Sequence, residues 1–229
     1  MEETTKTALV TGASAGFGRA VALALAGRGW QLILTARGED RLGKIRADTG
    51  AVAVAGDIAD PAHRAELARI VGGRPLDLVL NNASALGPSP LPALEHYPLA
   101  ELAAVLDTNV LAPLAIAQLT LPSLRAANGV LIDVSSDAAI GGYEGWGGYG
   151  ASKAALDQLT NVLAAENPAL RIYSFDPGDM RTEMHQAAFP GEDISDRPLP
   201  ETVVPALLHL LDTRPASGRY IASELPVAS

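Results

Sequence analysis

TALVTGASAGFG, residues 7–18, joins a short apolar run to a glycine-rich turn. The run predicts a buried strand, and the apolar period of residues 17–28 predicts a helix that begins directly after the turn. Glycine lets the backbone bend sharply and approach a ligand, while unpaired amides and the dipole at a helix start attract negative charge. The segment therefore indicates a pyrophosphate site, although a tight strand-to-helix turn without a ligand would show the same glycines. The residues assigned to this site are Gly12, Ser14, Ala15, Gly16, Phe17 and Gly18.

Short apolar runs alternate with longer segments of helical period along the rest of the chain, which is typical of repeated βαβ units. The fold class that follows is α/β: a single-domain, Rossmann-type, doubly wound parallel sheet of about seven strands, with helices on both faces, over residues 1–229. We predict strands at 7–11, 31–36, 52–55, 76–81, 130–135, 170–175 and 219–222. We predict helices at 17–28, 39–48, 61–71, 99–127 and 201–212, and one from the glycine-rich stretch 141–150 to residue 166.

Two segments depart from this simple alternation. The long helix at 99–127 is expected to bend or to begin afresh near Pro113 and Pro122, because proline removes a backbone donor. The polar stretch 187–200 contains proline and is expected to pass over the functional site.

The composition argues against several classes of function. A formal net charge of -9, with 17 scattered Lys and Arg residues, does not suit a nucleic-acid surface. The chain has 0 cysteines, and its 4 histidines show no ligand spacing, so we expect neither a disulfide nor a metal site. The amino terminus lacks the apolar core of a signal peptide, and no apolar run approaches the length of a membrane span. We therefore expect a cytoplasmic protein without a nucleic-acid or membrane partner.

Tyr149 and Lys153 stand four residues apart at the head of a predicted helix, which places them on one face. A phenol has a pKa of about 10, and a neighbouring ammonium lowers that pKa by stabilising the phenolate. The pair is therefore suited to proton transfer at neutral pH, with Tyr149 as the general acid. A chance pair of exposed side chains has the same spacing, so the assignment depends on the surrounding motifs.

The glycine pattern G-x-x-x-G-x-G after Thr11 resembles that of the short-chain dehydrogenase/reductase (SDR) family. Further motifs resemble those of the family in the same order: Asn-Asn-Ala-Ser at 81–84, Ser136 thirteen positions before Tyr149, Tyr-Gly-Ala-Ser-Lys at 149–153 and Pro-Gly-Asp-Met-Arg-Thr at 177–182. The resemblance runs from Thr7 to about Thr182. It implies an oxidoreductase that uses a nicotinamide cofactor.

The resemblance also implies the roles of three residues around Tyr149. Ser136 is expected to hydrogen-bond the substrate oxygen, unless it only caps its strand, in which case Ser135 is the next candidate. Lys153 is expected to bind the nicotinamide ribose. Asn109 is expected to hold a water behind Lys153 in a proton relay, with an irregularity inside the long helix as its alternative role.

The second predicted strand ends in Leu-Thr-Ala-Arg at 34–37, without the acidic residue that an NAD-specific site places against the ribose hydroxyls. The planar donor fork of Arg37 suits a 2′-phosphate, and the resemblance implies NADP(H) as the cofactor. Ala15 replaces the basic residue that many NADP-preferring relatives carry within the glycine motif. An ordinary solvated arginine is therefore the alternative role of Arg37.

Further cofactor contacts are implied by the family pattern. Asp57, followed by Ile58, matches the residue that contacts adenine, although Asp57 or Asp60 also suits a helix N-cap. Ser84 replaces the final glycine of the family's Asn-Asn-Ala-Gly, which a negative φ would permit. The other contacts implied by the resemblance are Asn82, Ala83, Tyr149, Lys153, Pro177, Gly178, Met180 and Thr182.

The sequence as a whole predicts an NADP-dependent carbonyl reductase or alcohol dehydrogenase that acts on a ketone or aldehyde. The family suggests a homodimer or homotetramer, paired through the apolar faces of the long helix and of the helix after Tyr149. An NAD-dependent alcohol dehydrogenase and a non-catalytic dinucleotide-binding protein are the alternatives. Side chains that either line an apolar substrate pocket or belong to ordinary packing are Ala138, Tyr143, Trp146, Met184 and Phe189.

Overall fold

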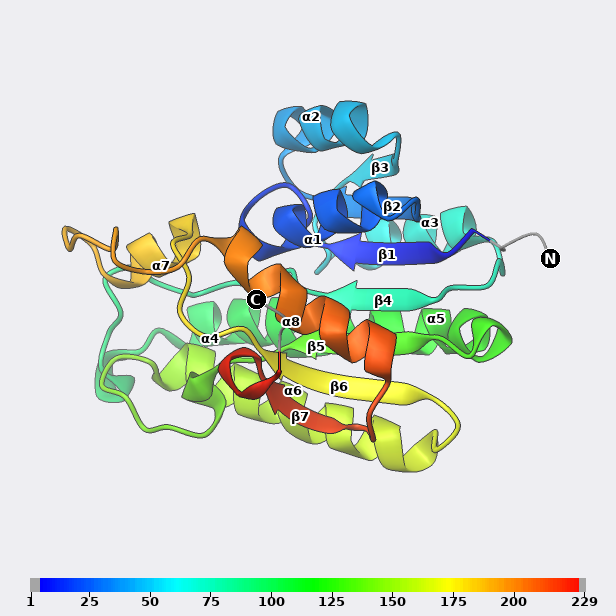
Figure 1. Ribbon diagram of the computed structural model, residues 1–229. Coiled ribbons are helices and arrows are strands. Elements are labelled where there is room, and N and C mark those ends of the chain that lie inside the picture. The colour runs from blue at the N-terminus through cyan, green and yellow to red at the C-terminus, as the bar shows by residue number, and fades with distance from the viewer. Residues whose placement is uncertain (1–4, 227–229) are drawn as a thin grey trace.

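The computed structural model describes residues 5–226 and places seven strands in one parallel sheet (Figure 1). Their order is β3-β2-β1-β4-β5-β6-β7, so the chain crosses from one side of β1 to the other and the sheet is doubly wound. The predicted seven-strand parallel sheet is confirmed, with each strand within two residues of its predicted bounds. The strands are β1 (Thr7–Thr11), β2 (Gln31–Ala36), β3 (Val52–Ala55), β4 (Leu78–Asn81), β5 (Val130–Val134), β6 (Arg171–Asp176) and β7 (Gly218–Ile221).

Helices cover both faces of the sheet because neighbouring residues of each strand point to opposite sides. Leu9 and Ile33 pack in a buried cluster with residues of α3, α5 and α6, whereas Val10 and Leu34 pack in a second cluster with residues of α1, α2 and α8. Figure 1 shows α8 crossing in front of the sheet and α5 and α6 behind it. The helices are α1 (Gly16–Gly27), α2 (Glu39–Thr49), α3 (Pro61–Val71), α4 (Leu99–Leu106), α5 (Ala112–Ala127), α6 (Gly147–Glu166), α7 (Glu183–Ala188) and α8 (Pro200–Thr213).

The long helical stretch changes its hydrogen-bonding pattern between α4 and α5. A π-helical turn at Asp107–Leu111 separates them, and α5 carries Pro113 in its first turn, where a missing amide costs no internal bond. The predicted restart near Pro113 is therefore confirmed, whereas no new helix begins near Pro122, because α5 continues through that proline. The packing of α5 against β4, β5 and α3 outweighs the low helix propensity of proline.

The same stretch, Leu99–Ala127, is long and apolar enough to cross a membrane, with a hydropathy of 1.6 over its most apolar window. The expectation that no apolar run approaches the length of a membrane span is therefore wrong, because this stretch meets the criteria of length and apolar composition. The stretch lies against β4, β5, α3 and α6, which is the position of a helix that packs on a sheet. Residues 1–4, which open the segment used to argue against a signal peptide, lie outside the described residues, and the cytoplasmic location stays a prediction.

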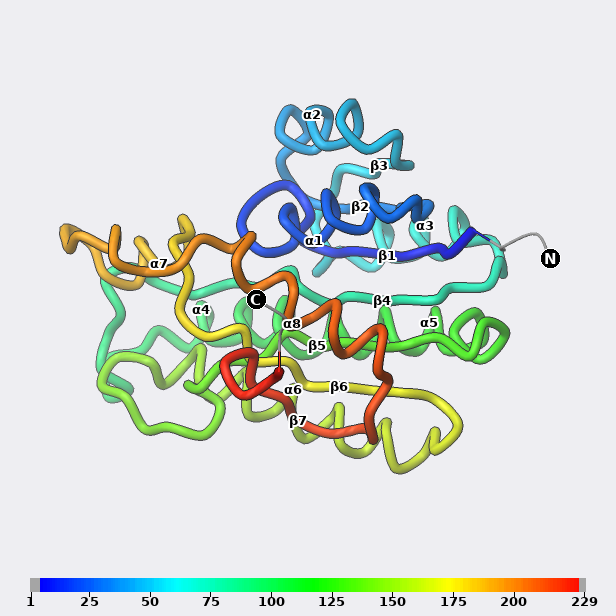
Figure 2. Tube along the Cα trace, in the orientation of Figure 1, coloured from blue at the N-terminus to red at the C-terminus, as the bar shows by residue number. Residues whose placement is uncertain are grey.

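The carboxyl ends of the parallel strands meet at one edge of the sheet, where α7 and the segment between α7 and α8 extend outward (Figures 1 and 2). This segment includes most of the polar stretch 187–200, and α7 itself is a helix that the sequence pattern does not predict. Ligands of open α/β sheets bind at the edge where the strands end. The fold therefore places this segment beside the expected site.

Candidate active site

A cavity of about 1030 Å³ opens at the carboxyl edge of the sheet. Its size is sufficient for a dinucleotide and a small substrate together. All but two of the residues assigned from the sequence to cofactor or catalysis line it, and these two are Gly18 and Asn109. The lining residues among them are Gly12, Ser14, Ala15, Gly16, Phe17, Arg37, Asp57, Ile58, Asn82, Ala83, Ser136, Tyr149, Lys153, Pro177, Gly178, Met180 and Thr182.

The glycine-rich turn between β1 and α1 leaves amides free for an anion. Gly12 has a φ of 65°, and a Cβ there would stand 2.8 Å from the Cα of Ala83. The N-cap of α1 is Ala15, which gives no side-chain hydrogen bond, and the first turn holds no acidic residue. Uncapped amides and an uncompensated helix dipole fit a pyrophosphate.

Asn82 supports this turn. Its Nδ2 donates to the carbonyl oxygens of Thr11 at 3.1 Å and Gly12 at 3.2 Å. The Thr11 hydroxyl accepts from the backbone amides of Asn82 and Ala83, both at 3.0 Å. Asn82 borders the cavity as expected, but its side-chain amide binds the backbone of the turn, so it shapes the seat of the phosphates.

Two arginines lie on the wall of the cavity that follows β2. Arg41 is held by Glu183 of α7, with both carboxylate oxygens accepting at 2.8 Å. Arg37 is exposed, and its guanidinium makes no hydrogen bond or ion pair with another residue of the described range 5–226. Of these two arginines, Arg37 is therefore the one whose guanidinium can pair with an anionic group of a ligand.

Asp57 and Asp60, the two candidates for the N-cap of α3, both follow the end of β3. Asp60 caps α3, because its carboxylate accepts from the amide of Ala62 at 2.9 Å. Asp57 accepts from the amide of Ala59 at 2.9 Å and lines the cavity. Of the two carboxylates, Asp57 is thus the one that borders the space for a ligand.

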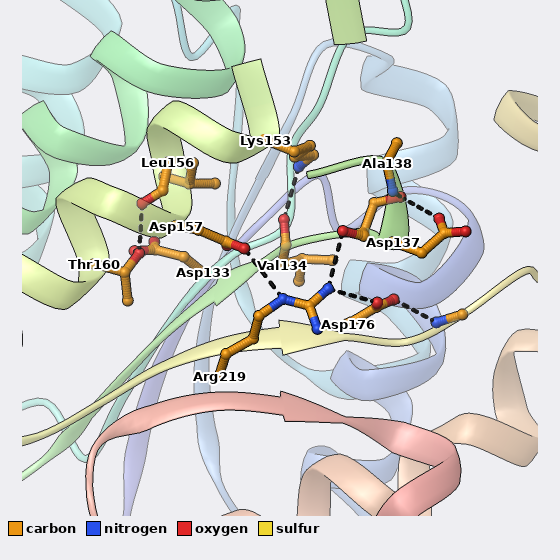
Figure 3. A network of polar contacts seen from close by, with 12 residues as sticks. Asp133, Val134, Asp137, Ala138, Lys153, Leu156, Asp157, Thr160, Asp176 and Arg219 are labelled. Atoms are coloured by element: carbon orange, nitrogen blue, oxygen red, sulfur yellow. Dashed lines mark hydrogen bonds and ion pairs between the residues drawn. The ribbon is translucent and has the colours of Figure 1, made fainter. Parts of the chain in front are cut away.

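Tyr149 and Lys153 both stand in the first two turns of α6, as their spacing predicts. Lys153 is 2% exposed, and its Nζ donates to the carbonyl oxygen of Val134 at 2.7 Å (Figure 3). Nζ lies 5.5 Å from the centroid of the Tyr149 ring. Burial lowers the pKa of Lys153 to about 8, although the nearby carboxylates of Asp133 and Asp157 raise it.

The pKa of Tyr149 is raised, mainly because the phenol is buried. The Ser84 and Ser136 hydroxyls contact the phenol and lower this pKa, while the negative charge of Asp176 raises it further. The expectation that the neighbouring ammonium gives Tyr149 a lowered pKa is therefore wrong. Burial dominates, and Lys153 turns its ammonium toward a backbone carbonyl. The phenol consequently keeps its proton at neutral pH.

Ser136 presents its hydroxyl at the end of β5. Its Oγ donates to Asp137 Oδ1 at 3.0 Å and accepts from the amide of Ala138 at 3.2 Å. Ser135, the alternative candidate, is 2% exposed, and its Oγ has no partner within the described chain. Ser136 is the one of the two whose hydroxyl contacts Tyr149, so the geometry favours it.

Asn109 is fully buried in the π-helical turn. Its Oδ1 accepts from the amide of Ala85 at 2.7 Å and from the Ser84 hydroxyl at 3.2 Å. Its Nδ2 donates to the carbonyl of Ala85 at 2.8 Å and to the Ser152 hydroxyl at 2.9 Å. Because protein groups occupy the side-chain amide, a water bound by Asn109 would have to use its backbone carbonyl. The water relay stays a prediction.

An apolar cluster adjoins Tyr149 and includes most of the predicted pocket residues. Trp146 and Met184 line the cavity, and Trp146 meets Tyr149 edge-on with ring centroids 5.6 Å apart. Ala138 and Phe189 belong to this cluster but do not line the cavity, and Tyr143, which is 50% exposed, belongs to neither. Its ring folds back over Gly141, as the glycine-rich loop permits. The cluster residues are Leu86, Ala138, Tyr149 and Ala188, packed against Leu91, Trp146, Met184, Ala187 and Phe189.

Comparisons with known proteins agree with this geometry. A family model described as short chain dehydrogenase matches residues 6–193. Serine 3-dehydrogenase of Rhizobium radiobacter is 37% identical over 184 residues, which cover 77% of this chain and 73% of the relative. Sepiapterin reductase of Mus musculus is 34% identical over 199 residues, which cover 79% and 76%. A solved structure from Shigella flexneri, assigned to the short chain dehydrogenases and complexed with NADP, has a TM-score of 0.87 and 32% identity over 95% of this chain and 97% of that chain.

Proposed function

The chain belongs to the short-chain dehydrogenase family of oxidoreductases, and we propose that it is an NADP(H)-dependent carbonyl reductase that also runs in reverse as an alcohol dehydrogenase. The observation that carries the proposal is the geometry of one cavity, which brings the phenol of Tyr149 and the ammonium of Lys153 together with the uncapped start of α1. We further propose that residues 1–229 form one domain that binds both the dinucleotide and the substrate.

The groups along the cavity wall fit the successive parts of the cofactor. The turn at Gly12 and Gly16 would hold the pyrophosphate, and Arg37 would pair with the 2′-phosphate of NADP(H). The similar Shigella flexneri structure is a complex with NADP, which supports the same cofactor here. The buried ammonium of Lys153 would bind the nicotinamide ribose. When bound, NADPH supplies a hydride to the carbonyl carbon.

The protein's own groups stabilise the oxygen of the reacting carbonyl. Tyr149 donates its phenolic proton to that oxygen as negative charge develops on it. Ser136 gives a second hydrogen bond by rotating its hydroxyl away from Asp137 Oδ1, while its contact with the Ala138 amide keeps Oγ in place. Trp146 and Met184 exclude water from one side of the substrate. A ketone or aldehyde with an apolar substituent suits this wall.

The test is a panel of ketones and aldehydes, with NADPH consumption followed by absorbance. The wild type should turn over at least one carbonyl, whereas Tyr149→Phe should bind NADPH normally and lose roughly 10²-fold or more in kcat, the scale of a removed general acid. A Tyr149→Phe enzyme with undiminished turnover would refute the role of the phenol.

We also propose a homo-oligomer, built on an apolar surface of the long helix and α6. Leu99, Leu111 and Leu119 on the long stretch, and Val162 on α6, are large apolar side chains that are exposed. Burying such side chains between copies is favourable. The mass in solution by light scattering should be that of a dimer or tetramer, and a monomer would overturn the proposal.

A further inference from the structure

Arg219, on β7, bridges three segments of the active site (Figure 3). Its Nη2 donates to Asp176 Oδ2 at 2.7 Å and to the backbone carbonyl of Ser136 at 3.0 Å. Its Nε donates to Asp157 Oδ2 at 3.2 Å. A planar guanidinium thus joins the end of β5, the end of β6 and the middle of α6. Arg219 lies beyond residue 193, where the match to the family model ends.

The ion pairs in this bridge are largely withdrawn from water. The side chains of Arg219, Asp157 and Asp176 are 21%, 13% and 4% exposed. Exposed pairs contribute little, whereas a buried pair leaves an uncompensated charge when one partner is removed. Removing Arg219 would therefore leave the buried carboxylates of Asp157 and Asp176 without their cation.

Each bridged segment carries a group of the proposed mechanism. The Ser136 carbonyl that Arg219 holds belongs to the residue whose hydroxyl faces the substrate oxygen. The second oxygen of Asp176 accepts from the amide of Gly178 at 2.9 Å, which fixes the Pro-Gly turn of the cavity wall. Asp157 lies one helical turn after Lys153.

Arg219 also offsets charge. The carboxylate of Asp176 acts on the phenol of Tyr149, and that of Asp157 acts on the ammonium of Lys153. The guanidinium lies between these two carboxylates, so it limits the field that they impose on the reacting pair.

We propose that Arg219 is a positioning residue of the active site, which sets the relative placement of Ser136, α6 and the turn at Gly178. This inference rests on the proposed function, since the aligned groups are those assigned to hydride and proton transfer. The sequence gives no motif for it, because the three partners of Arg219 are 43, 62 and 83 positions away.

The test compares Arg219→Met with Arg171→Met. Arg171 is a partly buried arginine on β6 whose Nε donates to the carbonyl of Arg214, and it does not line the cavity. Arg219→Met should lower kcat about 10- to 100-fold, with the KM for NADPH changed less than about threefold, because misplaced groups slow the reaction more than they weaken binding. Arg171→Met should keep the wild-type kcat even where its melting temperature falls.

The fluorescence of bound NADPH supplies a readout that needs no turnover. Arg219→Met should alter the emission of the bound nicotinamide, because the Gly178 turn loosens, whereas Arg171→Met should not. If no carbonyl is reduced by the wild type, the proposed function fails, and an altered emission in Arg219→Met alone still supports the positioning role. Equal kcat and equal emission in the two methionine variants would overturn the inference.

Arg219→Lys covers the case in which the methionine variant does not fold. Lysine keeps the positive charge, so this variant should fold. Its ammonium cannot reach three acceptors in one plane, so kcat should fall in part or the emission of bound NADPH should change in part. A lysine variant that matches the wild type in both would show that charge alone matters, and the positioning role would be wrong.

Discussion

The hydroxyl of Ser84 donates to Oδ1 of Asn109 at 3.2 Å, and it also contacts the phenol of Tyr149. Ser84 stands where the family's motif has glycine, and it has no positive φ that would strain a side chain. The Asn109 oxygen keeps a second donor, the amide of Ala85 at 2.7 Å, when Ser84 turns away. The serine is therefore free to direct its hydrogen to the phenolate when Tyr149 loses its proton.

Removal of this hydroxyl should move the pH dependence of alcohol oxidation. Ser84 lowers the pKa of Tyr149, so Ser84→Ala should raise that pKa, and oxidation, which needs the phenolate, should require a higher pH. Carbonyl reduction at neutral pH should change only severalfold, since the phenol stays protonated. Initial rates across a pH series would show the shift. The exposed Ser223→Ala serves as control, and an unmoved profile in Ser84→Ala would contradict the role of the hydroxyl.

The sequence alone predicts the sheet well, because strands buried on both faces read as continuous apolar runs. It also predicts which motifs meet, since parallel strands bring their carboxyl ends to one edge. It does not predict the raised pKa of Tyr149, which depends on burial by distant segments. It misses Ser84 as a partner of Asn109, because that contact depends on the π-helical turn. It leaves Tyr143 between the pocket and ordinary packing, and the structure shows a half-exposed ring that does not line the cavity.

The buried ammonium of Lys153 should make stability depend on pH. The folded pKa of about 8 lies below the ordinary value of 10.5, so the unfolded chain binds the extra proton between these values. Stability from this group is therefore present above pH 10.5 and lost as pH falls through 8. The difference in free energy of unfolding between wild type and Lys153→Met should grow with pH across that window by roughly 3 kcal/mol. Urea unfolding at several pH values measures it, and a flat difference would contradict the burial of a charged Lys153.

Arg37 should determine the preference between the two nicotinamide cofactors. Arg37→Ala should weaken NADPH roughly 10- to 100-fold, the scale of one lost charge-assisted contact, and should leave NADH nearly unchanged. Arg41→Ala is the matched control, since Glu183 already occupies that guanidinium, and its effect on NADPH should be smaller. Fluorescence titration of both cofactors gives the affinities. Equal losses for NADPH and NADH in Arg37→Ala would remove the assignment of the 2′-phosphate.

Two glycines of α1, Gly18 and Gly27, differ in what surrounds them. Replacing each with alanine therefore distinguishes the effect of close packing at the phosphate turn from the effect of helix propensity. A Cβ on Gly18 would lie 2.4 Å from Asn82 Nδ2 and 2.5 Å from the Gly12 carbonyl oxygen, whereas a Cβ on Gly27 meets nothing within 4 Å. Gly18→Ala should therefore displace Asn82 from the turn, lower the melting temperature and weaken NADPH at least tenfold, about 1.4 kcal/mol of binding free energy. Gly27→Ala should keep NADPH affinity and hold or raise the melting temperature, because alanine reduces the entropy of the unfolded chain. If both variants bind NADPH like the wild type, the turn does not hold the phosphates in the way its geometry indicates.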